Sequence, residues 1–360
     1  MNLRKVLIVN PFGIGDVLFT TAVINALNRD IPGIKIGYLC NTRAAEILKD
    51  NPHVDHIFIY DRDEFETLKK KSFFSWVKKG MDFIHEIKDK RFDAALDFSL
   101  NSQYGFFCWL AGIKNRVGFD YKGRGILLTE RIGFSGYSDK HVVEYYGDIL
   151  HHLGLELKDS LPSLYVKAKD LSKIENLLAQ EGVSGIDFLI GIIPGGGLSW
   201  GQDAYLKHWP AKNFAILADK FIENYQAKII IMGDFKEAGI AKDVLGHMRH
   251  KAIDFSGRTS IAELSALISK MNLVIANDGG PLHMANALGL KTVSIFGPVD
   301  DKVYGPYPRG AKHLVVKNDI YCRPCYKNFR YPECNNNHKC LEDITVDEVY
   351  EGVNNLISVA

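Results

Sequence analysis

Residues 273–300, LVIANDGGPLHMANALGLKTVSIFGPVD, decide the fold of this chain. The apolar run at 273–276 is typical of a buried strand, because both faces of a parallel sheet are covered. A glycine-containing turn follows, and residues 282–288 then have the pattern of a helix. Residues 291–296 are apolar again and predict the next strand. A strand, a helix and a strand in this order predict a parallel βαβ unit and therefore an α/β fold.

The turn between the first strand and the helix has the residues of an anion site. Asp278 is a good helix N-cap, and Pro281 suits the first helical turn. Gly279 and Gly280 let a ligand approach the backbone, and the helix start offers free N–H groups and a positive dipole end. His283 lies in the first helical turn and can face the same ligand. We therefore predict a phosphate site, although a glycine turn that only shapes the chain gives the same pattern.

Length and composition describe a globular protein of two domains. The chain has 360 residues, a length that usually divides into more than one hydrophobic core. Its composition, with 46% hydrophobic and 24% charged residues, is that of an ordinary globular protein. The net charge of +1 argues against nucleic acid as a partner, because such binding rests on many phosphate contacts. No apolar run reaches transmembrane length, and the first residues predict a strand instead of a signal peptide. We therefore expect a cytoplasmic protein with reduced thiols.

The first predicted strand of the chain is residues 6–9, and a second glycine-rich turn follows it. Gly13 and Gly15 suggest a dinucleotide fingerprint, but Leu18 replaces its third glycine, so we do not expect a nicotinamide site. Asp16 stands at the start of the next helix, above the strand ends, where open α/β sheets bind ligands. A helix cap is the alternative role for an aspartate at this position.

Three separately spaced motifs resemble those of glycosyltransferase family 9, the heptosyltransferases that build the inner core of lipopolysaccharide. Residues 278–287, DGGPLHMANA, followed by a strand and Phe-Gly-Pro, are similar to the nucleotide-sugar motif of that family. Residues 13–20, GIGDVLFT, resemble its N-terminal motif. The Pro-Gly turn and Lys-x-Trp-Pro within residues 194–210 resemble a third. One departure is Gly279, which stands where the family usually has Ser or Thr, so a hydroxyl contact to the donor phosphate would be missing.

The resemblance implies a GT-B fold, in which two Rossmann-like domains face each other across a cleft. Residues 1–160 would bind the acceptor, residues 171–343 the nucleotide-sugar donor, and residues 344–360 would form a helix that crosses back to the first domain. The implied reaction is inverting transfer of heptose from ADP-L-glycero-β-D-manno-heptose to a lipopolysaccharide inner-core acceptor or related glycan. A sugar-nucleotide epimerase, or another non-transferring enzyme on the same fold, is the alternative. A metal-stapled binding protein without turnover is a third possibility.

The resemblance also assigns roles to single residues. Asp16 would be the catalytic base, and Lys207 would be the cation for the donor phosphate. Glu237 stands where the family has an acid near the donor ribose, with Asp234 as the alternative. The other expected donor contacts are in the glycine turn: Asp278, Gly279, Gly280 and His283. A similar basic segment of the acceptor half gives three acceptor candidates, which a solvated basic loop would equally explain: Arg116, Lys122 and Arg124. Because fixed cations and N–H groups can hold a diphosphate, no catalytic metal is expected.

Residues 69–79, KKKSFFSWVKK, combine lysines with large aromatic side chains. Such a segment suits a membrane interface that carries anionic lipid, and an enzyme with a lipid-linked acceptor would need one. We therefore expect peripheral contact with the inner face of the inner membrane. A solvated basic helix is the alternative interpretation.

The C-terminal region contains four of the six cysteines: Cys322, Cys325, Cys334 and Cys340. A Cys-x₂-Cys pair with two further thiols matches a closed tetrahedral site for a structural zinc or iron ion. Reduced thiols in a compact loop are the alternative, because the spacing is tighter than in most zinc modules.

Overall fold

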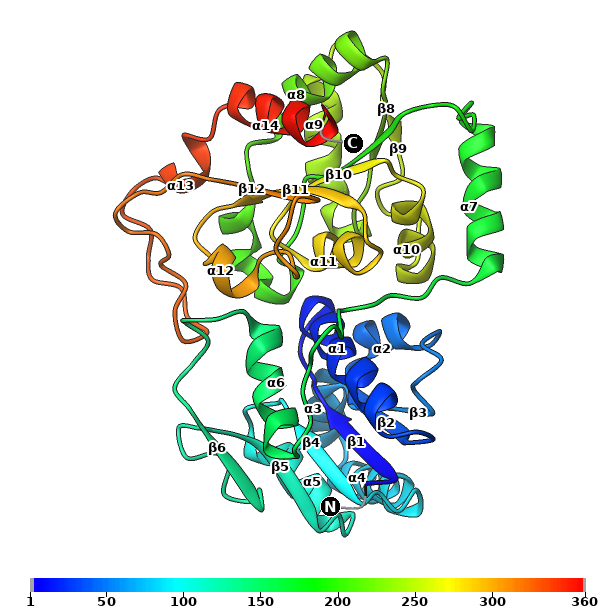
Figure 1. Ribbon diagram of the computed structural model, residues 1–360, viewed down its shortest axis with the longest axis vertical. Helices are drawn as coiled ribbons and strands as arrows, with labels where there is room; N and C mark the ends of the chain where they lie inside the picture. Colours follow the sequence, from blue (N-terminus) through cyan, green and yellow to red (C-terminus); the bar gives the residue numbers. More distant parts are fainter. Residues whose placement is uncertain (1–2, 359–360) are drawn as a thin grey trace. The chain divides into compact units, whose positions relative to one another are not determined.

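The computed structural model describes residues 3–358, except for the side chains of residues 198 and 199. The chain divides into two compact units, Met1–Ser163 and Leu164–Ala360. Each unit contains a six-stranded sheet (Figure 1). The division falls between residues 160 and 171, the limits given above for the two expected domains.

All strands of the first sheet are parallel, in the order β3-β2-β1-β4-β5-β6. Their bounds are β1 (Lys5–Val9), β2 (Lys35–Cys40), β3 (His56–Ile59), β4 (Ala94–Asp97), β5 (Asn115–Tyr121) and β6 (Glu130–Phe134). Val9 lies opposite Leu39 of β2 and Asp97 of β4, so β1 is the centre of the sheet. Residues around Arg116, for which a solvated basic loop was the alternative interpretation, form strand β5.

Helices cover both faces of the first sheet. They are α1 (Ile14–Asp30), α2 (Thr42–Leu48), α3 (Arg62–Lys71), α4 (Phe73–Asp89), α5 (Ser102–Leu110) and α6 (Val142–His152). Neighbouring strand residues point to opposite faces, so Tyr38 of β2 contacts Thr20 of α1 while Leu39 packs in a cluster with α4 and α5. The strands are apolar runs because both faces are buried in this way.

The second sheet repeats the topology of the first, in the order β12-β11-β10-β7-β8-β9, and all its strands are parallel. Their bounds are β7 (Leu189–Ile193), β8 (Lys228–Ile231), β9 (Ile253–Asp254), β10 (Leu273–Asn277), β11 (Lys291–Phe296) and β12 (His313–Lys317). In both sheets the first strand is central, the next two lie on one side and the last three on the other. This is the Rossmann order, and the predicted α/β fold is confirmed.

The helical segments of the second unit are α7 (Ala168–Gln180), η1 (Leu198–Lys207), α8 (Ala211–Tyr225), η2 (Phe235–Glu237), α9 (Ala238–His247), α10 (Ile261–Ser269), α11 (Gly280–Ala287), α12 (Asp301–Tyr304), α13 (Lys339–Glu342) and α14 (Val346–Ser358). The resemblance implied that the last helix crosses back onto the first domain, and this stays a prediction. In the structure α14 packs on α8 and β12 of its own unit. Its apolar residues Val349 and Val353 are fully buried in the second core, which explains the placement.

The topology places the motifs at equivalent points of the two sheets. The strand order reverses between β1 and β4 in the first sheet and between β7 and β10 in the second. Open α/β sheets bind ligands at the carboxyl ends of strands at such switch points. Asp16 follows β1, and Asp278 follows β10 directly.

Candidate active site

Two glycine turns meet at the switch point of the second sheet. The turn at 194–197 follows β7 and the turn at 278–280 follows the neighbouring strand β10. A Cβ atom on Gly279 would lie 3.1 Å from Cα of Gly196, which leaves little room for any larger residue. The close approach of the two turns accounts for Gly279 at the position where Ser or Thr was expected.

Lys207 and Asp278 form a buried ion pair beside these turns. Lys207 ends η1, and its Nζ lies 2.6 Å from Oδ2 of Asp278; the side chains are 9% and 5% exposed. The two charges stabilise each other, because either one alone would carry a large desolvation cost in this position. The expected N-cap role of Asp278 is wrong, since α11 is capped by Gly279 and the carboxylate of Asp278 accepts from Lys207 instead.

His283 lies on the other side of the same carboxylate. Its Nε2 is 3.9 Å from Oδ1 of Asp278, and its side chain is 7% exposed. Burial lowers the pKa of His283 to about 4; Asp278 opposes this shift, and Lys207 adds to it. The imidazole is therefore neutral near pH 7 and brings no charge to a ligand. Lys207 is the cation of this cluster.

Glu237 is joined to the first glycine turn. Its Oε1 accepts a hydrogen bond from the backbone N–H of Gly196 at 2.7 Å, and its Oε2 accepts from the N–H of Asp234 at 3.2 Å. A Cβ on Gly195 would lie only 2.5 Å from the carboxyl carbon of Glu237. Of the two acids considered from the sequence, the structure places Glu237 at the turn, while Asp234 caps η2 by accepting from the N–H of Lys236.

Trp200 lies over Lys207, and two tyrosines contact the ring of Trp200; none of the three was anticipated from the sequence. Nζ of Lys207 lies 3.9 Å from the ring centroid of Trp200. That ring stacks on Tyr326 at 4.5 Å and meets Tyr331 edge-on at 5.1 Å. Both tyrosines belong to the cysteine-rich segment, so this segment reaches the ion pair through Trp200. The sequence carries no local signal for this contact, because the residues belong to separate segments.

In the first unit, Asp16 occupies the first turn of α1 at the end of β1. The helix N-cap is Gly13, and no side chain caps it, so Asp16 is not the cap considered from the sequence. The N-terminal dipole end of α1 favours a negative charge at this position. Burial raises the pKa of the Tyr137 hydroxyl, and the charge of Asp16 is the next cause. The side chain of Asp16 therefore lies near the buried hydroxyl of Tyr137.

A second acid in this unit, Asp97, ends β4 and is 5% exposed. Its Oδ1 accepts a hydrogen bond from the N–H of Ser99 at 2.8 Å. Burial raises the pKa of Asp97 to about 6, against the opposing effect of Ser99. The sequence signal for this residue was an acid at the carboxyl end of an apolar strand, at the switch point beside Asp16.

Comparison with known proteins agrees with this geometry. A sequence model of glycosyltransferase family 9 (heptosyltransferase) matches residues 81–335. The chain belongs to this family. It is therefore a glycosyltransferase, and its two Rossmann-type sheets are those of the GT-B fold.

Three relatives illustrate how far the similarity extends. Lipopolysaccharide heptosyltransferase 1 of Campylobacter coli is 24% identical over 311 residues, which cover 81% of this chain and 84% of that one. A family 9 glycosyltransferase of known structure from Veillonella parvula has a TM-score of 0.84 at 21% identity, covering 99% and 98% of the two chains. The ADP-heptose lipopolysaccharide heptosyltransferase II of Escherichia coli has a TM-score of 0.76 at 21% identity, covering 99% of each chain.

The three acceptor candidates of this family 9 member have unequal surroundings. Arg116 is half-buried; its Nε donates to the carbonyl of Leu127 at 2.6 Å, and its Nη1 donates to the carbonyl of Ile113. These bonds hold the segments before and after β5, so Arg116 already has a structural role. Lys122 and Arg124 are exposed and lie over the ring of Tyr121, at 4.9 and 5.9 Å from its centroid.

The cysteine cluster of the transferase shows thiols near one another without a closed site. Burial raises the pKa of Cys325, and the neighbouring Cys322 adds to the shift. Burial likewise raises the pKa of Cys340 to about 11, with Cys325 as the next cause. Within residues 3–358, however, no three His, Cys, Asp or Glu side chains are placed to hold a metal ion. The donor chemistry suits zinc or iron, but the side-chain geometry described here does not close around one.

A buried arginine fixes the cysteine-rich segment to the loop after β11. Nε of Arg323 donates to the carbonyl of Gly297 at 2.6 Å, and its Nη2 lies 2.9 Å from Oδ1 of Asp301. The N–H groups of Cys325 and Tyr326 donate to the carbonyl of Pro298. The carbonyl groups of the Phe-Gly-Pro motif thus hold this segment in place.

Proposed function

We propose that this glycosyltransferase moves heptose from ADP-L-glycero-β-D-manno-heptose to a lipopolysaccharide inner-core acceptor. The observation that carries the proposal is the buried Lys207–Asp278 pair beside the start of α11, at the switch point of the second sheet. Membership of family 9 supports it, as does the Escherichia coli relative, whose name gives ADP-heptose and lipopolysaccharide.

The second unit would bind the donor through its diphosphate. Lys207 supplies the positive charge, and Asp278 holds its ammonium group in place. The first N–H groups of α11 and the positive end of its dipole would face the β-phosphate. His283 is neutral at pH 7 and would contribute a hydrogen bond. Glu237, which already binds the turn at Gly196, would set the shape of the ribose side of the site.

The first unit would supply the base and bind the acceptor. Asp16 would take the proton of the acceptor hydroxyl as its oxygen attacks C1 of the heptose. The bond between C1 and the β-phosphate oxygen breaks as the new bond forms, and its electron pair leaves with ADP. A single displacement of this kind inverts the configuration at C1. Lys122 and Arg124, the exposed cations beside Tyr121, are the better candidates for acidic acceptor groups, because Arg116 is bonded within its own unit.

Charge on the leaving diphosphate would be balanced by fixed groups of the protein. Lys207 and the N–H groups of α11 do this without reorganisation during the reaction. We therefore propose that transfer requires no divalent cation. Activity should persist in the presence of a chelator that removes Mg²⁺, and a requirement for added Mg²⁺ would contradict the proposal.

For the cysteine cluster we propose a structural ion, zinc or iron, that draws the four thiols together. Bound metal would release thiol protons, which the crowded, buried thiols otherwise retain. Elemental analysis of purified protein should find close to one ion per chain, and chelation should lower the melting temperature. Metal-free protein of unchanged stability would leave the cysteines as reduced thiols.

The donor is tested by thermal shift with nucleoside diphosphates. ADP at about 100 times its dissociation constant should add roughly 2.7 kcal/mol to the free energy of unfolding, and UDP and GDP should add less. Equal shifts for all three would contradict an ADP-sugar donor.

Turnover is tested separately, by release of ADP from the ADP-sugar. A transferase releases ADP only when an acceptor is present, whereas an epimerase changes the sugar nucleotide alone. Family 9 membership does not favour the epimerase. Conversion of the ADP-sugar in the absence of an acceptor would nevertheless support the epimerase alternative.

The proposed acceptor also suggests a location. A lipopolysaccharide core is built on a lipid, so we propose that the enzyme works in the cytoplasm at the inner face of the inner membrane. Cell fractionation with a salt wash would test this, since a peripheral protein leaves the membrane fraction when salt screens its charges.

A further inference from the structure

The outer face of α4 and α5 is apolar although these helices already bury an inner face. Phe83 and Ile87 of α4 and Cys108 of α5 are buried in the core cluster of the first unit. On the opposite side, Phe74 and Met81 of α4 are 86% and 66% exposed. Further exposed apolar residues of the two helices are Phe73, Phe106, Trp109 and Leu110.

The exposed residues form stripes and are not scattered singly. Phe74 and Met81 are about two helical turns apart and therefore lie on one side of α4. Phe106, Trp109 and Leu110 have the spacing of one face of α5. The rings of Phe106 and Trp109 stack at 5.9 Å between centroids. Helices α4 and α5 pack against each other, so the two stripes lie on neighbouring helices; we call them together the α4–α5 face. A contiguous apolar surface of this kind marks an interaction site.

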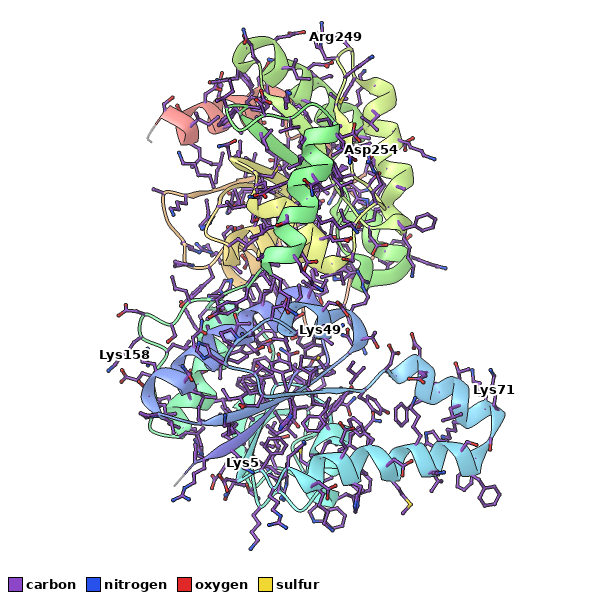
Figure 2. All side chains as sticks on the ribbon, turned by 90° about the vertical axis from the view of Figure 1, so that its right-hand side faces the viewer. Lys5, Lys49, Lys71, Lys158, Arg249 and Asp254 are labelled. Carbon is purple, nitrogen blue, oxygen red and sulfur yellow. The ribbon has the colours of Figure 1, made fainter. Side chains whose placement is uncertain are left out.

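Lysines surround one end of the α4–α5 face. Helices α3 and α4 form a hairpin that projects from the first unit, with Lys71 at its tip (Figure 2). Residues 69–79, around this tip, contain five lysines and no carboxylate. Lys69 lies over the ring of Trp76 at 5.4 Å, and Lys79 pairs with Glu64 of α3. The lysines at the tip are exposed beside Phe73 and Phe74, which gives this end a positive charge and an apolar surface together.

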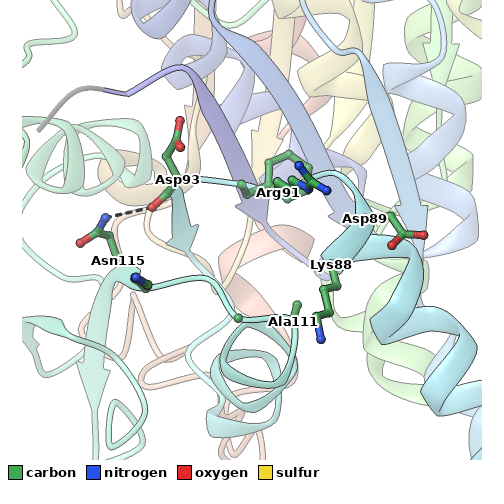
Figure 3. Close-up of a pocket in the computed structure, with 9 residues that line it drawn as sticks. Lys88, Asp89, Arg91, Asp93, Ala111 and Asn115 are labelled. Carbon is green, nitrogen blue, oxygen red and sulfur yellow. Dashed lines mark hydrogen bonds between the residues drawn. The ribbon is translucent and has the colours of Figure 1, made fainter.

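A basic pocket lies at the other end, where α4 and α5 finish (Figure 3). Its lining includes three cations, Lys88, Arg91 and Lys114, and two acids, Asp89 and Asp93. Oδ2 of Asp93 accepts from the N–H groups of Arg4 and Lys5 at 2.9 and 2.8 Å, and Oδ1 of Asp89 lies 3.7 Å from Nε2 of His85. Ala111 and Gly112, directly after α5, complete this wall of the pocket. An anionic group entering it would therefore meet more positive than negative charge.

We propose that the α4–α5 face docks on an anionic lipid bilayer. Phe74, Met81 and Trp109 would enter the boundary between headgroups and acyl chains, and the tip lysines would lie among anionic headgroups. The basic pocket would receive one anionic headgroup beside the inserted residues. Apolar side chains with cations at both ends match such a surface in chemistry and charge. Within residues 3–358 no helix is both long and apolar enough to cross a membrane, so contact of this kind is interfacial. This proposal rests on the proposed function in one respect: docking would bring the enzyme to a lipid-linked acceptor.

Vesicle flotation tests the proposal directly. The full chain should bind vesicles of phosphatidylcholine mixed with phosphatidylglycerol and should not bind phosphatidylcholine alone. A variant with Phe74→Ser, Met81→Ser and Trp109→Ser should bind the mixed vesicles at least about tenfold more weakly, given the worth of burying apolar side chains. A variant with Lys88→Glu and Lys114→Glu should lose about fivefold for each lysine, and its remaining binding should depend less on salt.

Matched controls come from the second unit. Ile186 is 96% exposed and Lys251 is exposed, and neither lies on the α4–α5 face. Ile186→Ser and Lys251→Glu should leave vesicle binding unchanged. All variants should keep the parent melting temperature and ADP affinity, and should turn over an acceptor freed of its lipid at the parent rate, which separates this proposal from the proposed function. The proposal is overturned if the parent ignores anionic vesicles, if the control variants weaken binding equally, or if the α4–α5 face binds another protein and not the vesicles.

Discussion

The two units share one strand order, yet their switch points differ in how far the functional groups are assembled. In the second unit Nζ of Lys207 and Nε2 of His283 lie 2.6 and 3.9 Å from the two carboxylate oxygens of Asp278, and all three side chains are buried. In the first unit Asp16 stands in the first turn of α1, while Lys122 and Arg124 are exposed on a turn after β5. A diphosphate has a fixed shape and charge, and a preformed cluster suits it. The first unit places the proposed base on a rigid helix and the proposed acceptor-binding cations on a turn, an arrangement that suits a larger and more variable acceptor.

The largest effect should follow from a substitution that removes the proposed functional group of the first unit and leaves the second unit unchanged. Asp16→Asn removes the proton acceptor that we propose, so the transfer rate should fall by roughly 10²–10⁴-fold while ADP affinity stays the same. Gly13 caps α1, so neither asparagine nor alanine at position 16 removes a cap. Loss of the favourable interaction with the helix dipole should cost about 0.3–1 kcal/mol of folding free energy. Initial rates, ADP titration and thermal melting measure the three quantities.

Asp97→Asn is the matched control, since it changes the same chemical group at the neighbouring strand end. The carboxylate of Asp97 is buried and accepts from Ser99, so we expect altered stability and near-parent turnover. If Asp16→Asn keeps its activity and Asp97→Asn loses it, Asp97 is the base.

The second largest effect should follow from a change that breaks the donor cluster. Lys207→Met removes the cation and leaves Asp278 buried without its partner, which typically costs about 3–5 kcal/mol of folding free energy. ADP affinity should fall by about one to two orders of magnitude, the worth of a charged hydrogen bond. Chemical denaturation and ADP titration provide the two measurements.

A double variant separates the two consequences. Lys207→Met with Asp278→Asn should recover much of the stability but not the ADP affinity, because the unpaired charge is gone and the cation is still missing. Lys212→Met, at an exposed position on α8, should change neither. Unchanged ADP affinity in Lys207→Met would show that the diphosphate binds elsewhere.

The sequence could predict that Asp278, Gly279 and His283 lie together, for a physical reason, whereas their role in donor binding stays a prediction. Asp278 and Gly279 directly follow an apolar strand, and residues at that place in a parallel sheet meet at its carboxyl edge. Lys207 lies ten residues beyond its turn, and only the family resemblance pointed to it. Trp200 and Tyr326 could not be predicted, because 126 residues separate them and no local periodicity records their stacking.

Strand β5 shows why the first unit was harder to predict. Gly118 and three cations made a solvated basic loop the alternative interpretation of residues 115–125. In the structure a Cβ on Gly118 would lie 2.5 Å from the carbonyl oxygen of Asp97 on β4. The glycine therefore serves close packing of neighbouring strands and not a turn, and this requirement depends on the pairing partner.

A pH series should make the stabilities of the two units diverge. The pKa of His283 is about 4 in the folded protein, below its ordinary value of 6.5. As the pH falls from 6.5 to about 4, the histidine therefore takes up a proton in the unfolded chain before it does so in the folded one. The second unit therefore loses stability on acidification. The pKa of Asp97 is about 6, above its ordinary 3.8, so the folded first unit takes up a proton first and gains stability over nearly the same window. Each group is worth about 2–3 kcal/mol between the two limits.

Hydrogen exchange measured between these pH limits, and corrected for intrinsic rates, resolves the two units. Amides of β10 should lose protection relative to amides of β4 as pH falls. His283→Gln should flatten the response of the second unit, and Asp97→Asn that of the first. Parallel loss of protection in both units would contradict the opposite signs.

The smallest effect should come from the aromatic cover of Lys207, and it tests whether the preformed state of the donor cluster depends on the cysteine-rich segment. Trp200→Leu removes a cation–π contact worth about 0.5–2 kcal/mol, so ADP affinity should fall by roughly 2–30-fold. Trp200→Phe keeps an aromatic face and should lose less. Tyr326→Leu should act in the same direction as Trp200→Leu because its ring supports that of Trp200, whereas Tyr321→Ser, at a position 90% exposed in the same segment, should not. If the four cysteines bind a metal ion, chelation should reproduce the loss seen in Tyr326→Leu and add nothing to Trp200→Leu, since both act through the same ring. An ADP affinity that ignores all of these changes would mean that Asp278 alone holds Lys207 in place.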